Sequence, residues 1–240
     1  MSYLSFIRDE NLEKEVRTIL STATAALEKA NTEFESNVID PFSIAFEMAG
    51  FNIKEVEMWE AGEKSRQSQK TLSNAFGNFH QNILGCVPGW VNLKIGNSVD
   101  LECPDRKIIA EVKNKYNTMT GGKLTDLYSH LDGLVMPIVS KYKNFTSYYV
   151  ETIPRPKKNR PQNYDNPFTP SDKATETRKP ANELIRQIDG QSFYALVTGV
   201  PDALEQLYDV LPTVISNSSS YSFAPGELLI MKTYFKKAFI

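Results

Sequence analysis

A short stretch in the middle of the chain carries acidic and basic side chains at a spacing that suits metal-assisted chemistry. Within residues 99–113, the sequence from Pro104 to Lys107 favours a tight turn between two runs of alternating apolar and polar residues. If the two central residues of that turn form the loop of a hairpin, Asp100 lies directly opposite Glu111. Opposed residues of an antiparallel pair have Cβ atoms about 4.5–5.5 Å apart. The spacing therefore predicts two carboxylates at one point of a sheet surface.

The rest of the hairpin supports this register. Because side chains alternate between the two faces of a strand, one predicted face is apolar and the other is charged. The apolar face, which would pack on helices, consists of Val99, Leu101, Cys103, Ile108, Ala110 and Val112. The charged face consists of Asp100, Glu102, Glu111 and Lys113.

Two carboxylates this close repel each other unless a cation lies between them. Mg²⁺ prefers hard oxygen ligands, keeps several waters and also accepts substrate phosphate. We expect Asp100 and Glu111 to bind the metal, with the Val112 carbonyl as a further ligand. Lys113 would position or activate a water, or stabilise charge on a phosphate. The pattern predicts Mg²⁺-assisted phosphodiester hydrolysis; the competing interpretation is a solvent-facing strand pair with an ordinary contact between Lys113 and Glu111.

Helices are expected before this hairpin. Residues 11–35 carry apolar side chains at helical spacing on one face, which predicts a long amphipathic helix. A second helix should begin after Asp40 as its N-cap, with Pro41 at its first position and Gly50 just past its end. Residues 60–70 are polar and are predicted to form a loop, and residues 71–84 to form a third helix.

The pattern then changes to that of a mixed sheet. Strands are predicted at residues 90–95, 98–103, 107–113, 145–153 and 192–200, and helices at 124–141 and 202–215, the last bent or broken near Pro212. Six of the 13 prolines lie between Pro154 and Pro180, which favours a long extended loop there. This order of elements is typical of an α/β fold.

Composition excludes several classes of protein. The chain has 240 residues, of which 41% are hydrophobic and 23% charged, so it is neither disordered as a whole nor dependent on disulfides or metal for a core. The chain has only two cysteines, which form no Cys-x-x-Cys pair, and only two histidines, so a zinc site is not expected. The low cysteine content favours a reducing, cytoplasmic setting. The polar start and the absence of a long apolar run predict neither a signal peptide nor contact with a membrane.

Asp100, followed after ten residues by Glu111-Val112-Lys113, resembles the signature of the PD-(D/E)XK nuclease superfamily, with Val99 in place of the proline. The resemblance implies an α/β fold in which helices flank a mixed central sheet. We expect an N-terminal helical region at residues 1–60, and a nuclease domain at 61–240 with a basic, proline-rich insert at 154–180.

Three segments extend the resemblance to a type II restriction endonuclease family whose members recognise the short palindrome GGNCC. They are residues 66–72 (RQSQKTL), 77–85 (GNFHQNILG) and 109–118 (IAEVKNKYNT), within a resemblance that spans roughly residues 60–240. The superfamily often places an acidic residue or Gln near the metal, on the helix before the hairpin. Gln81 and Glu47 are the candidates for that role, whereas His80 is interpreted as a buried histidine rather than a general base.

Residues expected to contact DNA fall into four groups. They are Arg66, Gln67, Gln69 and Lys70 at the start of a helix; Asn78 and Gln81 on that helix; Asn114, Lys115 and Asn117 after the catalytic strand; and Lys157, Lys158 and Arg160 in the insert. The first group is expected to contact the edges of bases, because Arg and Gln can each form two hydrogen bonds with one base. Residues 141–186 hold ten basic and five acidic side chains, which favours phosphate contacts there. The competing interpretations are a solvated helix start and a solvated insert.

The leading hypothesis is a Mg²⁺-dependent endonuclease of the restriction type that acts on double-stranded DNA. A palindromic duplex has two-fold symmetry, so a homodimer is expected, with the first helix as a source of its interface. The resemblance also implies a companion DNA methyltransferase that acts on the same site without forming a stable complex. The alternatives are a structure-specific repair or recombination nuclease of the same superfamily, and a DNA-binding protein without catalysis.

Overall fold

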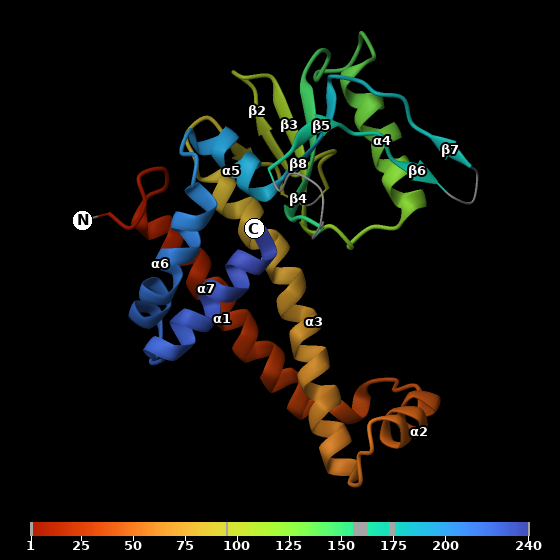
Figure 1. The fold of residues 1–240 in the computed structure, drawn as a ribbon, viewed down its shortest axis with the longest axis vertical. Helices are drawn as coiled ribbons and strands as arrows, with labels where there is room; N and C mark the ends of the chain where they lie inside the picture. The colour runs from red at the N-terminus through yellow and green to blue at the C-terminus, as the bar shows by residue number, and fades with distance from the viewer. Residues whose placement is uncertain (1, 95, 156–162, 173–175, 240) are drawn as a thin grey trace.

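The computed structural model describes residues 2–94, 96–155, 163–172 and 176–239 (Figure 1). Its helices are α1 (Asp9–Thr32), α2 (Pro41–Gly50), α3 (Val56–Gly85), α4 (Gly121–Val135), α5 (Gly190–Thr198), α6 (Ala203–Ser218) and α7 (Pro225–Phe239), with a short 3₁₀ helix at Phe34–Ser36. Its strands are β1 (Val91–Asn92), β2 (Leu101–Cys103), β3 (Ile108–Lys115), β4 (Thr146–Ile153), β5 (Asp165–Pro167), β6 (Ser171–Asp172), β7 (Thr177–Arg178) and β8 (Ile185–Asp189). Within these described residues, no helix combines the length and apolarity needed to cross a membrane.

One mixed sheet organises the fold. Its strand order is β1-β2-β3-β4-β8-β5, and β6 and β7 form a separate two-stranded sheet. β1, β2 and β3 are antiparallel neighbours, β3, β4 and β8 run parallel, and β5 is an antiparallel edge strand. The predicted mixed α/β architecture is confirmed.

Helices cover both faces of the sheet (Figure 1). On one face, α4 packs through Leu127 and Leu131 against Ile109 and Tyr149 of the central strands. On the other face, α5 and the ends of α1, α3, α6 and α7 share a larger core that contains Ala110. β3 is buried from both sides, since Ile109 and Ala110 are both fully inaccessible to solvent.

A long helical pair extends away from the sheet. Figure 1 shows α1 and α3 running side by side towards α2 at the far end of the molecule. α2 begins as predicted, because the Asp40 carboxylate accepts a hydrogen bond from the Phe42 N–H at 2.9 Å and Pro41 is the first helical residue. It ends one residue later than predicted, since Gly50 is its last residue and Phe51 follows as the C-cap.

The predicted loop at residues 60–70 was wrong, since α3 runs without a break from Val56 to Gly85. Ala, Glu, Lys, Arg and Gln dominate this stretch and are the strongest helix formers. The stretch packs on α1 through a narrow strip, in which the Ser68 hydroxyl lies 3.2 Å from the Ala26 carbonyl oxygen. A helix that buries so little surface lacks apolar residues repeated at helical spacing, so the hydrophobic pattern did not reveal it.

The predicted strand at residues 192–200 was also wrong. That segment is α5, and the strand beside β4 is β8, which the periodicity did not reveal. Short apolar runs do not distinguish a strand from a buried helix. The signals for a helix were its ends: Asp189 accepts a hydrogen bond from the Ser192 N–H at 3.0 Å, and Gly199 adopts a left-handed φ of 74°.

Three further differences concern the C-terminal third. Part of the segment predicted as an extended loop at 154–180 forms β5 of the main sheet and the β6–β7 hairpin. α6 was predicted at residues 202–215 with a bend or break near Pro212; it runs as one helix from Ala203 through Pro212 to Ser218, three residues beyond the predicted end. α7 was not predicted; its buried Phe235 and Phe239 complete the core between α1 and α6.

Candidate active site

The hairpin formed by β2 and β3 has the register predicted from sequence. Leu101 pairs with Ala110 and Cys103 with Ile108, and the Lys107 N–H closes the turn on the Pro104 carbonyl at 3.0 Å. The next step of this ladder places Asp100 beside Glu111. The register prediction is confirmed.

One detail of the predicted face pattern was wrong. Val99 packs with Ile109 beneath α4, whereas Leu101 lies in the core on the opposite face of the sheet. The chain bends before it enters β2 at Leu101, so the alternation of a strand does not extend back to Val99. Ile109 is buried on the face that carries the acidic residues, because α4 covers most of that face.

Asp100, Glu111 and Lys113 converge where β2 begins. The Lys113 ammonium lies 2.5 Å from Glu111 Oε1 and 3.9 Å from Asp100 Oδ2. Asp100 Oδ2 also accepts a hydrogen bond from the Val112 N–H at 2.8 Å. All three side chains are between 19% and 28% exposed, so they are shielded from bulk water but open to a ligand.

The electrostatics of this cluster favour a bound cation. Burial, and next the neighbouring Glu111 carboxylate, raise the pKa of Asp100 to about 6, against the opposing effects of Lys113 and the Val112 N–H. Two carboxylates therefore share one lysine in a partly desolvated place. A further positive charge would relieve the remaining repulsion.

The Val112 carbonyl adds a third oxygen to this cluster. Carbonyls two residues apart on a strand point in the same direction, and the Ala110 carbonyl accepts from the Asp100 N–H at 3.1 Å. The Val112 carbonyl thus points to the side of β2 but beyond its first residue, Leu101, and Gln81 Nε2 lies 3.5 Å from it. Two carboxylates and a carbonyl suit Mg²⁺, which keeps several waters as further ligands. Within the described residues, no group of three or more His, Cys, Asp or Glu side chains is placed to hold a metal.

A cleft of about 570 Å³ lies against these carboxylates. Its wall consists of Asn78, Gln81, Lys94, Gly96, Asn97, Ser98, Asp100, Glu111, Met119, Lys123, Asp126, Leu127 and His130. Ser98 is tied to α4 by a 2.5 Å hydrogen bond between His130 Nε2 and the Ser98 carbonyl. The cleft therefore lies between α3, the hairpin and α4.

Sequence reasoning missed Lys94 and Lys123, the two basic residues of the cleft wall. Lys123 comes from α4, which no local pattern connects to the hairpin. Lys94 is placed by close packing of β1 on α3: a Cβ on Gly85 would lie 2.6 Å from the Asn92 Cβ, and Asn92 in turn bonds Asn82 at 2.8 Å. The Gly at the end of the helix was a visible signal for this approach.

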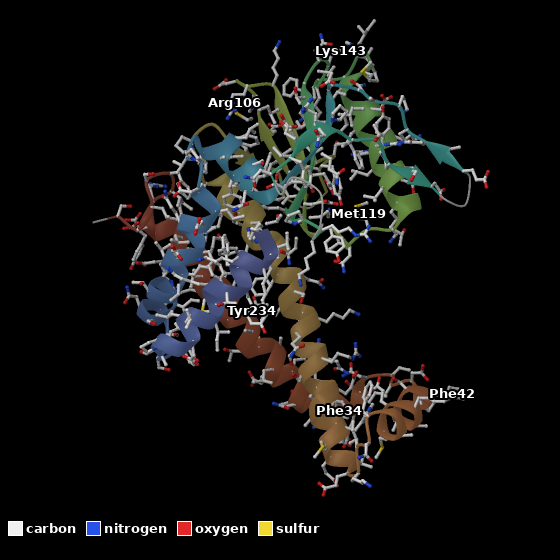
Figure 2. The ribbon with its side chains drawn as sticks, in the orientation of Figure 1. Phe34, Phe42, Arg106, Met119, Lys143 and Tyr234 are labelled. Carbon is white, nitrogen blue, oxygen red and sulfur yellow. The ribbon has the colours of Figure 1, made fainter. Side chains whose placement is uncertain are left out.

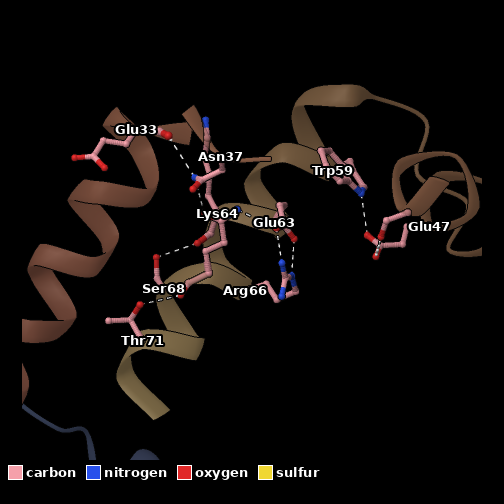
Figure 3. Close-up of polar contacts among 11 residues, drawn as sticks. Glu33, Asn37, Glu47, Trp59, Glu63, Lys64, Arg66, Ser68 and Thr71 are labelled. Carbon is pink, nitrogen blue, oxygen red and sulfur yellow. Dashed lines mark hydrogen bonds and ion pairs between the residues drawn. The ribbon is translucent and has the colours of Figure 1, made fainter. Parts of the chain in front are cut away.

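The structure separates the two candidates for the residue beside the metal. Gln81 lies in the cleft, next to the Val112 carbonyl. Glu47 lies on α2, where it accepts hydrogen bonds from Trp59 Nε1 at 2.9 Å and from Ser43 (Figure 3). His80 lies away from the cleft, 2.8 Å from the Tyr194 hydroxyl, and burial lowers its pKa to about 4. The interpretation of His80 as a buried histidine agrees with this placement.

The Arg66 group lies far from the cleft. Arg66, Gln67, Gln69 and Lys70 are in the interior of α3, not at the start of a helix, and Arg66 is about 22 Å along the axis from Gln81. Both sides of the Arg66 guanidinium contact Glu63, at 2.5 Å each (Figure 3). Gln67 bonds Glu63 and Asn37, at 2.9 and 3.0 Å.

The remaining predicted contacts lie elsewhere. Asn114 and Lys115 line an apolar pocket of about 430 Å³ between α1, α3, α6 and α7, and neither lines the cleft beside Asp100. Asn117 is exposed in the turn after β3. The predicted contacts Lys157, Lys158 and Arg160 lie outside the described residues.

Known proteins share this sequence over most of its length. The model of the Eco47II restriction endonuclease family matches residues 4–219. The chain is 51% identical to the type II restriction enzyme Eco47II of Escherichia coli, over 90% of this chain and 87% of that enzyme. It is 32% identical to the type II restriction enzyme Sau96I of Staphylococcus aureus, over 90% of this chain and 80% of that enzyme. With a nuclease-type hairpin inside the matched region, the chain belongs to the Eco47II restriction endonuclease family and is a type II site-specific deoxyribonuclease.

Proposed function

We propose that this enzyme uses Mg²⁺ to cut both strands of double-stranded DNA at a short palindrome of the GGNCC type. The convergence of Asp100, Glu111 and Lys113 at the edge of an open cleft is the observation that carries the proposal. The identity to Sau96I and Eco47II supports a related recognition sequence.

Asp100, Glu111 and the Val112 carbonyl would hold the ion. Mg²⁺ bound there would supply positive charge that stabilises a pentacovalent phosphate and favours ionisation of the attacking water. Lys113 would orient that water or donate a hydrogen bond to the phosphate oxygen that gains charge. Its ammonium already contacts Glu111, so it needs only a change of rotamer to serve either role. Gln81 would hold the Val112 carbonyl in place.

DNA would lie across the cleft. Lys94 and Lys123 on its walls, and Lys157, Lys158 and Arg160 of the insert, would contact phosphates, because lysine acts as a point charge without base preference. Asn78 and Gln81 are the amides nearest the cut. Asn114, Lys115 and Asn117 would contact phosphates that flank it. Arg66, Gln67, Gln69 and Lys70 would reach a more distant part of the duplex, with the Arg66 guanidinium released from Glu63.

A palindromic target and one catalytic cluster per chain imply a homodimer with one active site on each strand. The enzyme would act in the cytoplasm, where a companion DNA methyltransferase protects the same sites on the host chromosome without a stable complex.

A plasmid cleavage assay tests the proposal. Plasmids with and without a GGNCC site are incubated with enzyme in Mg²⁺ or in EDTA. We expect discrete bands only from the plasmid with the site and only with Mg²⁺. Cleavage in EDTA would exclude the metal, and cleavage that ignores the site would exclude this recognition sequence. Lys94→Ala should weaken binding to specific and random DNA alike and lower the slope of log affinity against log salt by about one.

A further inference from the structure

The far end of the helical pair exposes an unusual number of large apolar side chains. We define the arm tip as residues 37–59, which includes α2 and the start of α3. Its exposed large apolar residues are Val38, Phe42, Phe46, Phe51, Val56 and Met58. The three phenylalanines are each 73–76% exposed. Figure 2 shows Phe42 at the outer edge of α2, away from α3.

α2 has no buried residue, although only one of its ten side chains is charged. A helix of this length is marginal by itself in water, and helices in proteins are stabilised mainly by burial of an apolar face. Phe42 and Phe46 are four residues apart and so lie on one face. The contacts of α2 with α3 include the 2.9 Å hydrogen bond from Trp59 to Glu47, and Ile44 and Met48 are only half-buried. The face of α2 that carries Phe42 and Phe46 thus remains uncovered within the described part of the chain.

We infer that the arm tip is the surface through which two copies of this chain associate. The inference rests on the proposed function, which needs two catalytic clusters for two strands. The tip lies about 35 Å along α3 from Gln81, so contact between two tips leaves both clefts open to DNA. It replaces the expectation that α1 supplies the interface.

The size of the patch fits a stable dimer. An aromatic side chain buries about 150–250 Å², so three phenylalanines at three-quarters exposure offer roughly 350–550 Å². Val38, Val56 and Met58 extend the patch towards the roughly 800 Å² that each partner contributes to a standard interface. Contiguous apolar patches above a few hundred Å² are uncommon on monomers.

The charge of the tip fits a second copy rather than a charged partner. In a symmetric dimer the same surface meets itself, so like charges would oppose each other. Between residues 38 and 53 the only charged side chains are Asp40 and Glu47. Asp40 caps α2, and Glu47 is held by Trp59 and Ser43. The other charges of the tip, Lys54, Glu55 and Glu57, are exposed and of both signs, whereas those next to Phe42 and Phe46 are engaged within the chain. The α2 part of the tip can therefore pack against its own copy.

The experiment compares the full-length wild type with Phe42→Ser/Phe46→Ser by sedimentation velocity, free and on a duplex with one site. Ile138→Ser/Val139→Ser is the matched control, because those side chains are 89% and 96% exposed and lie outside the tip. We expect a dimer for the wild type and control, and a dissociation constant about 100-fold weaker for the tip variant, since each substitution acts twice. On plasmid, the tip variant should accumulate nicked circles where the wild type gives linear DNA.

Cross-linking adds a readout that does not depend on a destabilising change. Phe46→Cys with a short bis-maleimide should give a covalent dimer, because in the inferred dimer the two copies of residue 46 lie near the two-fold axis. The wild type, with Cys103 buried and Cys86 partly buried, measures the background of cross-linking. A monomeric wild type on DNA, an unchanged tip variant, or no cross-link above background would overturn the inference. A tip-dependent dimer that cuts no DNA would instead refute the proposed function and leave the interface standing.

Discussion

Replacing Asp100 by Asn should make the protein more stable while it abolishes cleavage. The pKa of Asp100 is raised from 3.8 to about 6 because the carboxylate is buried and lies beside Glu111. The folded state therefore holds a proton on Asp100 more tightly than the unfolded state does. The contribution of Asp100 to stability is greatest below pH 3.8 and is lost as the pH rises through 6, so above that pH its ionised carboxylate costs the folded state about 3 kcal/mol.

The Asn side chain removes this charge and still accepts the 2.8 Å hydrogen bond from the Val112 N–H. Asn also weakens the attraction of Lys113, which lies 3.9 Å away, so we expect a net gain of about 2 kcal/mol at pH 7.5. For a chain of this size that gain corresponds to roughly 4–8 °C in Tm. At pH 4 the gain should nearly vanish, because Asp100 is then protonated in the wild type.

Urea denaturation at pH 7.5 and pH 4, in EDTA, measures the gain. Asp126→Asn makes the same chemical change at an exposed position of the cleft wall and should leave stability within about 0.5 kcal/mol. Added Mg²⁺ should stabilise the wild type but not Asp100→Asn, since binding to the folded state alone raises its stability. A less stable Asp100→Asn at pH 7.5, or an equal gain at both pH values, would refute the electrostatic reasoning.

Three further predictions follow from particular contacts. Lys113→Met should lower the single-turnover cleavage rate by about 10²–10³ and leave DNA affinity within about threefold; a rate within tenfold of wild type would remove Lys113 from the chemistry. The pKa of His80 is lowered to about 4, so the folded state is stabilised above pH 6.5 and loses roughly 2–3 kcal/mol as the pH falls from 6.5 to 4; His80→Gln should lose less over that range in urea denaturation. Gly190→Ala should lower the free energy of unfolding by about 3 kcal/mol, because its Cβ would lie 2.1 Å from the Thr152 carbonyl oxygen. Gly133→Ala on the exposed side of α4 is the control and should raise it by up to about 1 kcal/mol. Equal melting temperatures for the two variants would contradict the contact.

The placement of the charged side chains on the hairpin could be predicted from the sequence because it is local. A two-residue turn and the period of two fix which side chains of adjacent strands meet, so Asp100, Glu111 and Lys113 were placed without knowledge of the rest of the fold. The start of α2 was predictable for the same reason, since Asp40 and Pro41 act within one helical turn. Where the local signal was ambiguous, as in the apolar run of α5, the element was assigned wrongly.

The cleft and the arm depended on contacts between distant segments. Lys123 reaches the hairpin only because α4 covers one face of the sheet, and Lys94 only because Gly85 lets β1 approach α3. The Arg66 group appeared close to the catalytic hairpin in sequence order, but a continuous α3 places it about 22 Å from Gln81. The polar stretch at residues 60–70 is rich in helix formers, but that alone does not decide whether α3 continues through it. The packing of α1 against α3 decides that it does. Local stereochemistry therefore determined the cluster of Asp100, Glu111 and Lys113, whereas tertiary packing decided what surrounds it and which apolar surface is left exposed.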